Sequence, residues 1–295
     1  MKVAICVNTR DRPTELSLLM VSLKNQTHKD WDLYILDDQG GTALQNYHFF
    51  NCISNIIKMD NHNIKFLRTE FPHGVSLARQ RILDEALKDP WDYYLRIDDD
   101  VICEPDFIEK LIEGMKEFDI MSGVTPGCAP QFVRDPEKMK IGARVVLDNK
   151  GNFIMNSDDY GMLYTDNKII PSDHFRSSAL IKREVFDKVR YAPTRLSKHG
   201  FREEQLFSFN AIVNGFKIGN HMNAIAWHLG CMSGGERFPD SNELVKFNEE
   251  VLKEDTIKLV EQNGNFIDKY HNKLGLNLLE PTEEELAIST NLIFK

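Results

Sequence analysis

The sequence predicts an α/β fold in which a mostly parallel central sheet is flanked by helices. Two observations predict it. Over the first hundred residues, short apolar runs alternate with stretches of helical length, and acidic or amide side chains follow three of those runs. Strands that alternate with helices are typical of βαβ units, whose strands are parallel. The 295 residues allow one large domain of this class or two smaller ones.

The first third of the chain supplies the alternating elements. Short apolar runs rich in β-branched and aromatic residues predict strands at 3–7, 31–36, 64–67 and 93–97. Residues 13–25 and 74–88 predict helices, and a further helical stretch separates the second strand from the third. Each strand is thus followed by a helix or by polar residues, which is the order that a parallel sheet requires.

The rest of the chain predicts a mixed sheet region and a helical tail. After a loop at 101–105, the pattern indicates helices at 106–118 and 203–214. Short apolar runs predict strands at 119–124, 143–147, 153–155, 177–181, 216–218 and 224–227. Residues 125–172 are rich in Gly, Pro, Asn and Asp, which indicates a small mixed or antiparallel extension. The tail from Asn242 onward is polar and of helical character.

Composition excludes several classes of protein. The 36 Lys and Arg residues against 45 Asp and Glu give a net charge of −9, which argues against a broad nucleic-acid-binding surface. The five cysteines are scattered without a C-x-x-C pair, so they predict neither a zinc site nor a disulfide framework and favour a reducing compartment. No stretch approaches the roughly 18–20 apolar residues of a membrane span. We therefore expect a cytoplasmic protein without a transmembrane segment.

Three consecutive carboxylates, Asp98, Asp99 and Asp100, follow the predicted strand at 93–97. Carboxylates this close repel one another unless a cation neutralises them, and hard divalent ions prefer such oxygen ligands. The alternative is an acidic turn or a helix N-cap, because Asp favours both places.

The polar residues at the strand ends fall at one edge of the predicted sheet. Asn8 and Thr9 follow the first strand, Asp37 and Asp38 end the second, and the three aspartates 98–100 follow the fourth. Ligands of parallel α/β sheets bind beyond the carboxyl ends of the strands. This edge is therefore the predicted functional site.

Ordered motifs along the chain carry a resemblance to a known family. They are K-V-A-I-C-V-N-T-R at 2–10, Q-T at 26–27, D-D at 37–38, G-V-S-L-A-R-Q at 74–80, D-D-D at 98–100, the run at 177–186, E-E at 203–204 and the histidine at 228. This ordered set resembles the family 2 inverting glycosyltransferases, which have the Rossmann-like GT-A fold. Two positions depart from the family pattern: Gln80 replaces Asn, and the pair Glu203-Glu204 replaces Glu-Asp.

The resemblance spans residues 1–230 and implies a division of the chain. It implies a GT-A catalytic domain at 1–235, with a nucleotide-binding half at 1–100 and an acceptor-side half at 101–235. Residues 236–295 would then form a helical C-terminal extension, and the glycine-containing segment 232–237 could act as a lid.

The resemblance also implies a metal site. Asp98 and Asp100, which stand at the place of the family's D-x-D motif, and His228 would hold Mn²⁺ or Mg²⁺ against the donor phosphates. Strand alternation would point Asp98 and Asp100 one way and Asp99 the other. Taken alone, a single histidine such as His228 is ordinarily a satisfied core or turn residue.

A second set of positions would bind the nucleotide-sugar donor. The resemblance places Asn8, Thr9 and Asp38 near the base and ribose, and Arg79 near the pyrophosphate. Asp98 and Asp99 would complete the set, with Asp99 facing the sugar. From the residues alone, Asp38 fits a simple turn nearly as well, and a lone helical arginine is usually a surface charge.

Transfer with inversion needs a base that takes the proton of the acceptor hydroxyl. The resemblance assigns this role to Glu204, with Glu203 as its partner or as the base itself. Acidic residues at a helix start also stabilise the helix dipole, which would explain one of the two without catalysis.

The predicted function is therefore metal-dependent, inverting transfer of a sugar from a nucleotide-diphospho-sugar, most simply a UDP-sugar, to an acceptor hydroxyl. The acceptor could be a glycan, a lipid-linked glycan or a protein, whereas a nucleic acid is disfavoured by the charge. Two alternatives stay open: a Mg²⁺-dependent nucleotidyltransferase, and a nucleotide- or carbohydrate-binding module without turnover. The first would need a glycine-rich phosphate loop near the N-terminus, and residues 8–12 lack glycine.

Overall fold

The computed structural model describes residues 1–125, 145–147, 150, 153–155, 168–175, 177–191, 195–200, 202–230, 234 and 242–276. Its strands are β1 (Val3–Thr9), β2 (Trp31–Asp37), β3 (Ile64–Arg68), β4 (Tyr93–Asp98), β5 (Val101–Cys103), β6 (Ile120–Val124), β7 (Val145–Leu147), β8 (Phe153–Met155), β9 (Ile169–Pro171), β10 (Ser178–Lys182) and β11 (Ile218–His228). The α-helices are α1 (Pro13–Lys24), α2 (His48–Met59), α3 (Val75–Ala86), α4 (Phe107–Gly114), α5 (Glu203–Val213), α6 (Asn242–Asn263) and α7 (Phe266–Lys273). Short 3₁₀ turns lie at Leu44–Asn46 and Arg183–Asp187.

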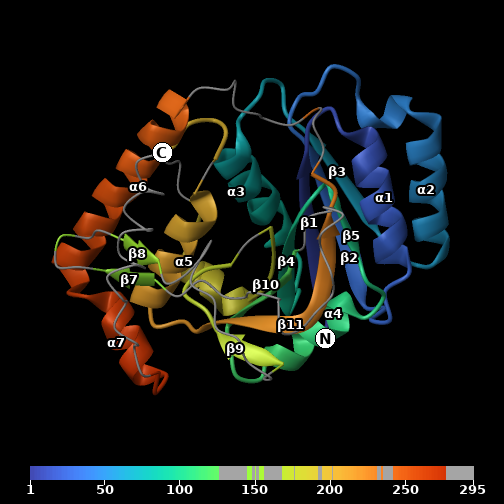
Figure 1. The fold of residues 1–295 in the computed structure, drawn as a ribbon. Coiled ribbons are helices and arrows are strands. Elements are labelled where there is room, and N and C mark those ends of the chain that lie inside the picture. The colour runs from blue at the N-terminus through green and yellow to red at the C-terminus, as the bar shows by residue number, and fades with distance from the viewer. Residues whose placement is uncertain are drawn as a thin grey trace.

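The central sheet has the order β3-β2-β1-β4-β10-β6-β11-β5, and β9 pairs with β11. Strands β1 to β4 run parallel to one another, so their carboxyl ends meet at one edge. Alternate residues of β1 point to opposite faces: Ile5 packs in the core beneath α1, and Cys6 in the core beneath α3. Figure 1 shows these helices covering the two faces. The predicted, mostly parallel sheet flanked by helices is confirmed.

The second half of the sheet mixes directions. Strand β10 lies antiparallel between β4 and β6, and β11 runs parallel to β6 and antiparallel to β5. Strands β7 and β8 form a separate antiparallel pair, as the sequence predicts for the small extension. Only parts of the segment 125–172 are described, so most of that extension lies outside the described residues.

Two local predictions are wrong, and both concern the strand that carries His228. The predicted strands at 216–218 and 224–227 are one strand, β11, whose backbone stays extended through the polar residues between them although its register with β6 shifts between Asn220 and Ile225. Residues 101–103 are not a loop but strand β5, in which Val101 is paired with His228. This pairing places His228 next to the residue that follows Asp100.

Helices α6 and α7 form the described part of the predicted helical tail. Phe266, Ile267 and Tyr270 belong to the same buried cluster as α5 and one face of the sheet. The Tyr270 hydroxyl accepts a hydrogen bond from the Ile218 amide at 2.8 Å. The C-terminal helices thus share the core of the preceding part of the chain. Residues 235–241, around the predicted domain boundary, and residues 277–295 lie outside the described residues.

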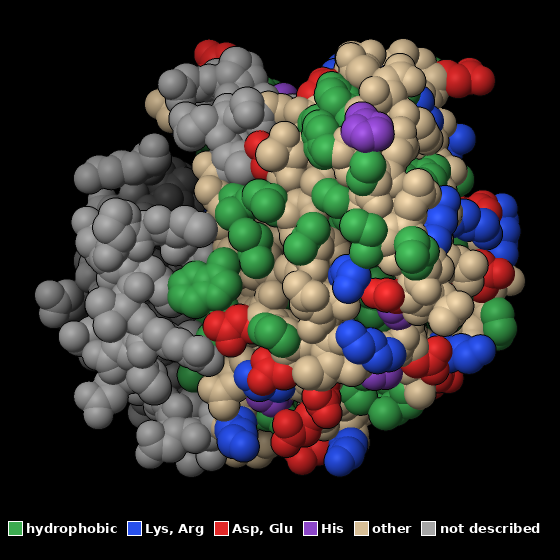
Figure 2. All heavy atoms as spheres, turned by 90° about the vertical axis from the view of Figure 1, so that its right-hand side faces the viewer, with side chains coloured by type: hydrophobic (Ala, Val, Ile, Leu, Met, Phe, Trp, Pro, Cys, Tyr) green, Lys and Arg blue, Asp and Glu red, His purple; other side chains and the backbone are tan. Residues whose placement is uncertain are grey.

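The outer face of α1 and α2 carries exposed apolar side chains. Leu18, Val21, Phe49 and Ile56 are each 42–45% exposed, and Met59 is 80% exposed. Figure 2 views this side of the molecule and shows hydrophobic side chains spread over its middle, with charged residues gathered towards its lower and right-hand parts. In the described part of the chain, no helix is both long and apolar enough to cross a bilayer.

Candidate active site

The three aspartates lie where β4 ends and a tight turn leads into β5, and they take different partners. Asp99 accepts a hydrogen bond from the Thr9 hydroxyl at 2.7 Å and forms an ion pair with Arg12 at 2.9 Å. Arg12 also contacts Asp100 at 2.9 Å. Burial raises the pKa of Asp99 to about 6, although Arg12 and Thr9 oppose the rise. One arginine therefore forms ion pairs with two carboxylates. We call Thr9, Arg12, Asp99, Asp100 and His228 the acidic loop.

His228 joins the acidic loop through the pairing of β5 with β11. Its Nε2 atom lies 3.3 Å from Asp100 Oδ1, and its side chain is 36% exposed. Hydrogen bonding to Asp100 raises the pKa of His228, although partial burial opposes the rise. Burial alone would raise the pKa of Asp100, but His228 and Arg12 hold it below its usual range. The imidazole and the carboxylate therefore face each other within hydrogen-bonding reach, with the imidazole partly open to solvent.

The donor set of this pair fits a divalent cation in part. One carboxylate and one imidazole at a half-open position suit Mn²⁺ or Mg²⁺ when phosphate oxygens and water complete the shell. Across the described residues, no three His, Cys, Asp or Glu side chains form a ready-made metal centre. The predicted third ligand, Asp98, faces Arg79 instead, at 2.6 Å. The predicted alternation fails because β4 ends at Asp98 and the next two residues form a turn.

A second charged group lies on the α5 side of Asp98. Arg79 from α3 donates to Asp98 and, through Nε, to Glu203 Oε1 at 2.9 Å. Arg96 from β4 donates to Glu203 and to Glu204, both at 2.9 Å. The glutamates belong to the first turn of α5, so the sheet, α3 and α5 meet at these two guanidinium groups. We call Arg79, Arg96, Glu203 and Glu204 the buried cluster.

The two glutamates of the buried cluster are not equivalent. Glu203 is 5% exposed, and its two oxygens accept from Arg79, Arg96 and the Glu204 amide. Burial and the neighbouring Glu204 charge raise the pKa of Glu203. Burial opposes ionisation of Glu204 too, but Arg96 overcomes it and holds the pKa of Glu204 well below its usual range. Glu204 is 22% exposed, so it is the ionised carboxylate with access to solvent.

Glu204 opens onto a pocket of about 400 Å³. The pocket lies between the start of α3, the end of β4 and the start of α5. Its lining includes Val75, Asp98, Ser177, His199, Arg202 and Glu204. Such a volume falls within the range of small-molecule sites. The buried cluster thus forms one wall of a substrate-sized opening at the carboxyl edge of the sheet.

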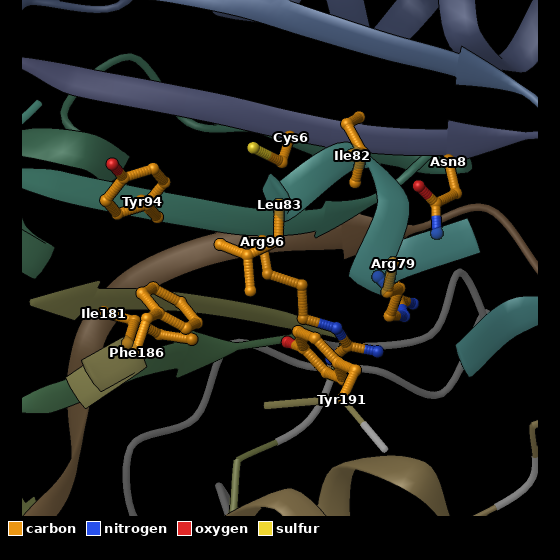
Figure 3. Close-up of a pocket in the computed structure, with 10 residues that line it drawn as sticks. All are labelled: Cys6, Asn8, Arg79, Ile82, Leu83, Tyr94, Arg96, Ile181, Phe186 and Tyr191. Atoms are coloured by element: carbon orange, nitrogen blue, oxygen red, sulfur yellow. The ribbon is translucent and has the colours of Figure 1, made fainter. Parts of the chain in front are cut away.

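Beneath the buried cluster lies a much smaller cavity of about 20 Å³ (Figure 3). Arg96 and Tyr191 lie side by side there, and the Asn8 amide lies on the same side of the sheet as Arg79. The Asn8 side chain has no hydrogen-bond partner among the described residues, and the Arg96 guanidinium is 5.4 Å from the Phe175 ring centre. Arg96 therefore has little space for water, and its charge is balanced by the carboxylates of Glu203 and Glu204.

The Asp38 carboxylate is hydrogen-bonded by groups of the protein itself. Its carboxylate accepts hydrogen bonds from the Thr69 hydroxyl at 3.0 Å and from the amides of His73 and Gly74 at 2.9 Å. It is 5% exposed. Gly74 has φ +81° and approaches the Lys198 backbone so closely that a Cβ atom would clash. Asp38 therefore fixes the turn that begins α3 and, with it, the position of Arg79.

Sequence reasoning located the carboxylates, Arg79 and His228 but missed two of the arginines that pair with the carboxylates. Arg12 and Arg96 were not among the predicted site residues. Arg96 did carry a signal, since a charged residue in the apolar run 93–97 needs a buried partner. Nothing in the sequence around Arg12 indicated a role in the site, apart from its position after the first strand. The segment 232–237, apart from Gly234, lies outside the described residues.

Comparison with known proteins adds the family. The sequence model described as Glycosyl transferase family 2 matches residues 4–190, well over half of the chain. The protein belongs to glycosyl transferase family 2. It is thus a glycosyltransferase, and the acidic loop and the buried cluster lie at the strand edge where the sequence predicted its active site. A comparison with curated proteins by sequence found no match.

Solved structures of glycosyltransferases share the fold. TarS 1–349 from S. aureus is 14% identical, with a TM-score of 0.56, covering 92% of this chain and 72% of that one. The same fragment in complex with UDP is 15% identical, with a TM-score of 0.53, covering 94% of this chain and 76% of that one. GalNAc-T7 with UDP, GalNAc and Mn²⁺ is 13% identical, with a TM-score of 0.60, covering 94% of this chain and 55% of that one. At these identities the likeness concerns the fold alone, and it confirms the predicted GT-A architecture.

Proposed function

We propose that the protein transfers a sugar from a nucleotide-diphospho-sugar, most simply a UDP-sugar, to an acceptor hydroxyl with inversion and with a divalent cation. The observation that carries this proposal is the ionised Glu204 carboxylate at the opening of the 400 Å³ pocket, next to the acidic loop. The donor identity is supported by TarS and GalNAc-T7, whose structures hold UDP.

The acidic loop would bind the diphosphate through a cation. Asp100 and His228 would hold Mn²⁺ or Mg²⁺, and the bound ion would neutralise the phosphate charge that develops as the nucleotide leaves. Arg12 forms ion pairs with both Asp99 and Asp100. When the cation binds, the Arg12–Asp100 ion pair would break and the Arg12–Asp99 ion pair would be kept. Thr9 holds Asp99 in place and thereby fixes the turn.

The buried cluster would supply the base. Glu204 is ionised and faces the pocket, so it can accept the proton of an acceptor hydroxyl as the oxygen attacks the anomeric carbon. Glu203 is the poorer candidate, because its two oxygens are taken by Arg79, Arg96 and the Glu204 amide. We therefore assign Glu204 as the base and Glu203 as the residue that holds both arginines.

Donor binding would draw on the residues around these two groups. Asn8 has no hydrogen-bond partner among the described residues and lines the 20 Å³ cavity together with Arg79. Arg79 and Asp98 lie between the pocket and the acidic loop, where the pyrophosphate and the sugar would meet. Asp38 and Thr9 act through the backbone and through Asp99, respectively. A glycan, a lipid-linked glycan or a protein could be the acceptor, and a cytoplasmic location remains a prediction.

The proposal is tested with a panel of UDP-, GDP- and dTDP-sugars in the presence of Mn²⁺ or of EDTA. Sugar transfer predicts metal-dependent release of the nucleoside diphosphate and a product whose anomeric configuration is inverted by NMR. Release of pyrophosphate from a nucleoside triphosphate and a sugar phosphate would instead identify a nucleotidyltransferase. Metal-dependent UDP binding without turnover of any donor would identify a binding module.

A further inference from the structure

The segment that leads into the catalytic helix α5 is held from outside by the C-terminal helix α6. This segment comprises residues 195–202, of which residue 201 is outside the described residues. Because α5 begins at Glu203, any shift of this segment also shifts Glu204. Its anchors therefore bear on the position of the proposed base.

The first anchor is Asn248 on α6. Its side chain is completely buried; Oδ1 accepts from the Ser197 amide at 2.9 Å, and Nδ2 donates to the Ser197 hydroxyl at 3.0 Å. The Ser197 carbonyl in turn accepts from the Gly200 amide, and the Gly200 carbonyl accepts from the Glu203 amide, both at 3.0 Å. A continuous series of hydrogen bonds thus connects α6 to the first residue of α5.

The second anchor is Glu249, the next residue of α6. Its Oε1 accepts from Arg202 Nε at 2.7 Å and from Nη2 at 2.6 Å. Arg202 has φ +77°, a backbone conformation that is uncommon for a residue with a side chain. A two-pronged ion pair with Glu249 stabilises this conformation one residue before Glu203.

The opposite side of the segment is fixed by α3. The Val75 amide donates to the Lys198 carbonyl at 3.0 Å, and Gly200, with φ +65°, packs against Val75 without room for a Cβ atom. The segment is therefore held between α3, which carries Arg79, and α6. Figure 1 shows α5 lying between these two helices.

We propose that Asn248 and Glu249 are positioning residues for catalysis, and that helix α6 is a working part of the active site rather than an appended tail. They touch neither donor nor acceptor; they set the start of α5 and so the distance from Glu204 to the acceptor hydroxyl. This inference rests on the proposed function for the role of Glu204, but its structural part stands independently of any activity.

The test compares Glu249→Gln with Glu250→Gln in the full chain. Both remove one carboxylate from neighbouring positions of α6, but Glu250 is exposed and lies outside the anchors. In Glu249→Gln, we expect faster hydrogen exchange at the amides of Ser197, Gly200 and Glu203, without a change in thermal midpoint beyond that of Glu250→Gln. With a donor that the wild type turns over, kcat should fall about 10–100-fold, because small misplacements of a catalytic group have such effects.

Three further readouts separate positioning from general weakening. The KM for the donor and the affinity for UDP with Mn²⁺ should stay within about twofold, since the acidic loop is not attached to α6. Glu249→Asp, which keeps the charge, should recover part of kcat. Ser197→Ala, which removes one bond to Asn248, should give a smaller loss of the same kind.

Failure of this inference differs from failure of the proposed function. If Glu249→Gln and Glu250→Gln match the wild type in both exchange and kcat, α6 does not position the base. If the wild type transfers no sugar while Glu249→Gln still accelerates exchange at Ser197 and Glu203, the anchor is real and the proposed function is wrong.

Discussion

The acidic loop and the buried cluster both pair carboxylates with arginines, but in different proportions and at different depths. In the acidic loop, Arg12 alone serves Asp99 and Asp100, and His228 is 36% exposed. In the buried cluster, Arg79 and Arg96 serve Glu203, Glu204 and Asp98, and both arginines are at least 91% buried. The first group has one arginine for two carboxylates and a half-exposed imidazole, which suits a place where a cation enters. The second has two buried arginines that join three carboxylates, which suits a fixed geometry.

The largest effect is expected from removing the proposed base. Glu204→Gln keeps the shape of the side chain but cannot accept a proton, so the transfer rate should fall about 10²–10⁴-fold. Affinity for UDP with Mn²⁺, measured by calorimetry, should stay near the wild-type value because the acidic loop is unchanged. Full turnover in this variant would mean that the buried cluster does not supply the base.

Next in size is the loss of a buried arginine. Arg96→Met leaves Glu203 and Glu204 buried with one guanidinium fewer, so the free energy of unfolding should fall by about 3–5 kcal/mol. Denaturant unfolding measures this loss. The matched control is Arg195→Met, which removes an ion-paired arginine that is 50% exposed and should cost less than about 1 kcal/mol. Equal effects in the two variants would contradict the claim that the buried ion pairs of Arg96 contribute more to stability than the exposed ion pairs of Arg195.

A smaller effect is expected in the acidic loop. Asp100→Ala removes the carboxylate shared by Arg12 and His228, so affinity for UDP in the presence of Mn²⁺ should fall by about 10–100-fold. Affinity without metal should change little. Asp60→Ala, at an exposed ion pair with Lys24, is the control and should bind as the wild type does. Unchanged metal-dependent binding in Asp100→Ala would remove Asp100 from the metal site.

The smallest effect concerns pH and the buried cluster. The folded pKa of Glu204 lies below its unfolded value, so the unfolded state binds more protons as the solution is acidified. The stability that Glu204 contributes is therefore complete above about pH 4.3 and is lost as pH falls below it. The slope of unfolding free energy against pH between about 5 and 3 should be smaller in Glu204→Gln than in the wild type. An identical slope would mean that Glu204 is not held ionised by Arg96.

Strands β1 to β4 could be predicted from the sequence because each is a short, mainly apolar run that is followed by a helix or by polar residues. Strand β11 could not be predicted as one element, because Asn220, His221 and Asn223 interrupt its apolar pattern although the backbone continues. Strand β5 has three residues and exists only through its pairing with β11. Tertiary pairing, not local sequence, defines the part of the sheet that carries His228.

The candidate site shows the same limit. The carboxylates could be predicted because clusters of acidic residues are conspicuous in the sequence and their order resembles a family. Two of the arginines that pair with them could not, since Arg12 meets Asp100 across 88 positions and Arg96 meets Glu203 across 107. The orientation of Asp98 also depends on which arginine it meets, and that depends on how α3 packs on the sheet.

The most direct test of the account is a crystal structure with UDP and Mn²⁺. It should place the cation against Asp100 Oδ and His228 Nε2, with Arg12 retained on Asp99 and Glu204 still bound to Arg96. A cation bound elsewhere, with Arg12 and His228 both still on Asp100, would contradict the division of work between the acidic loop and the buried cluster.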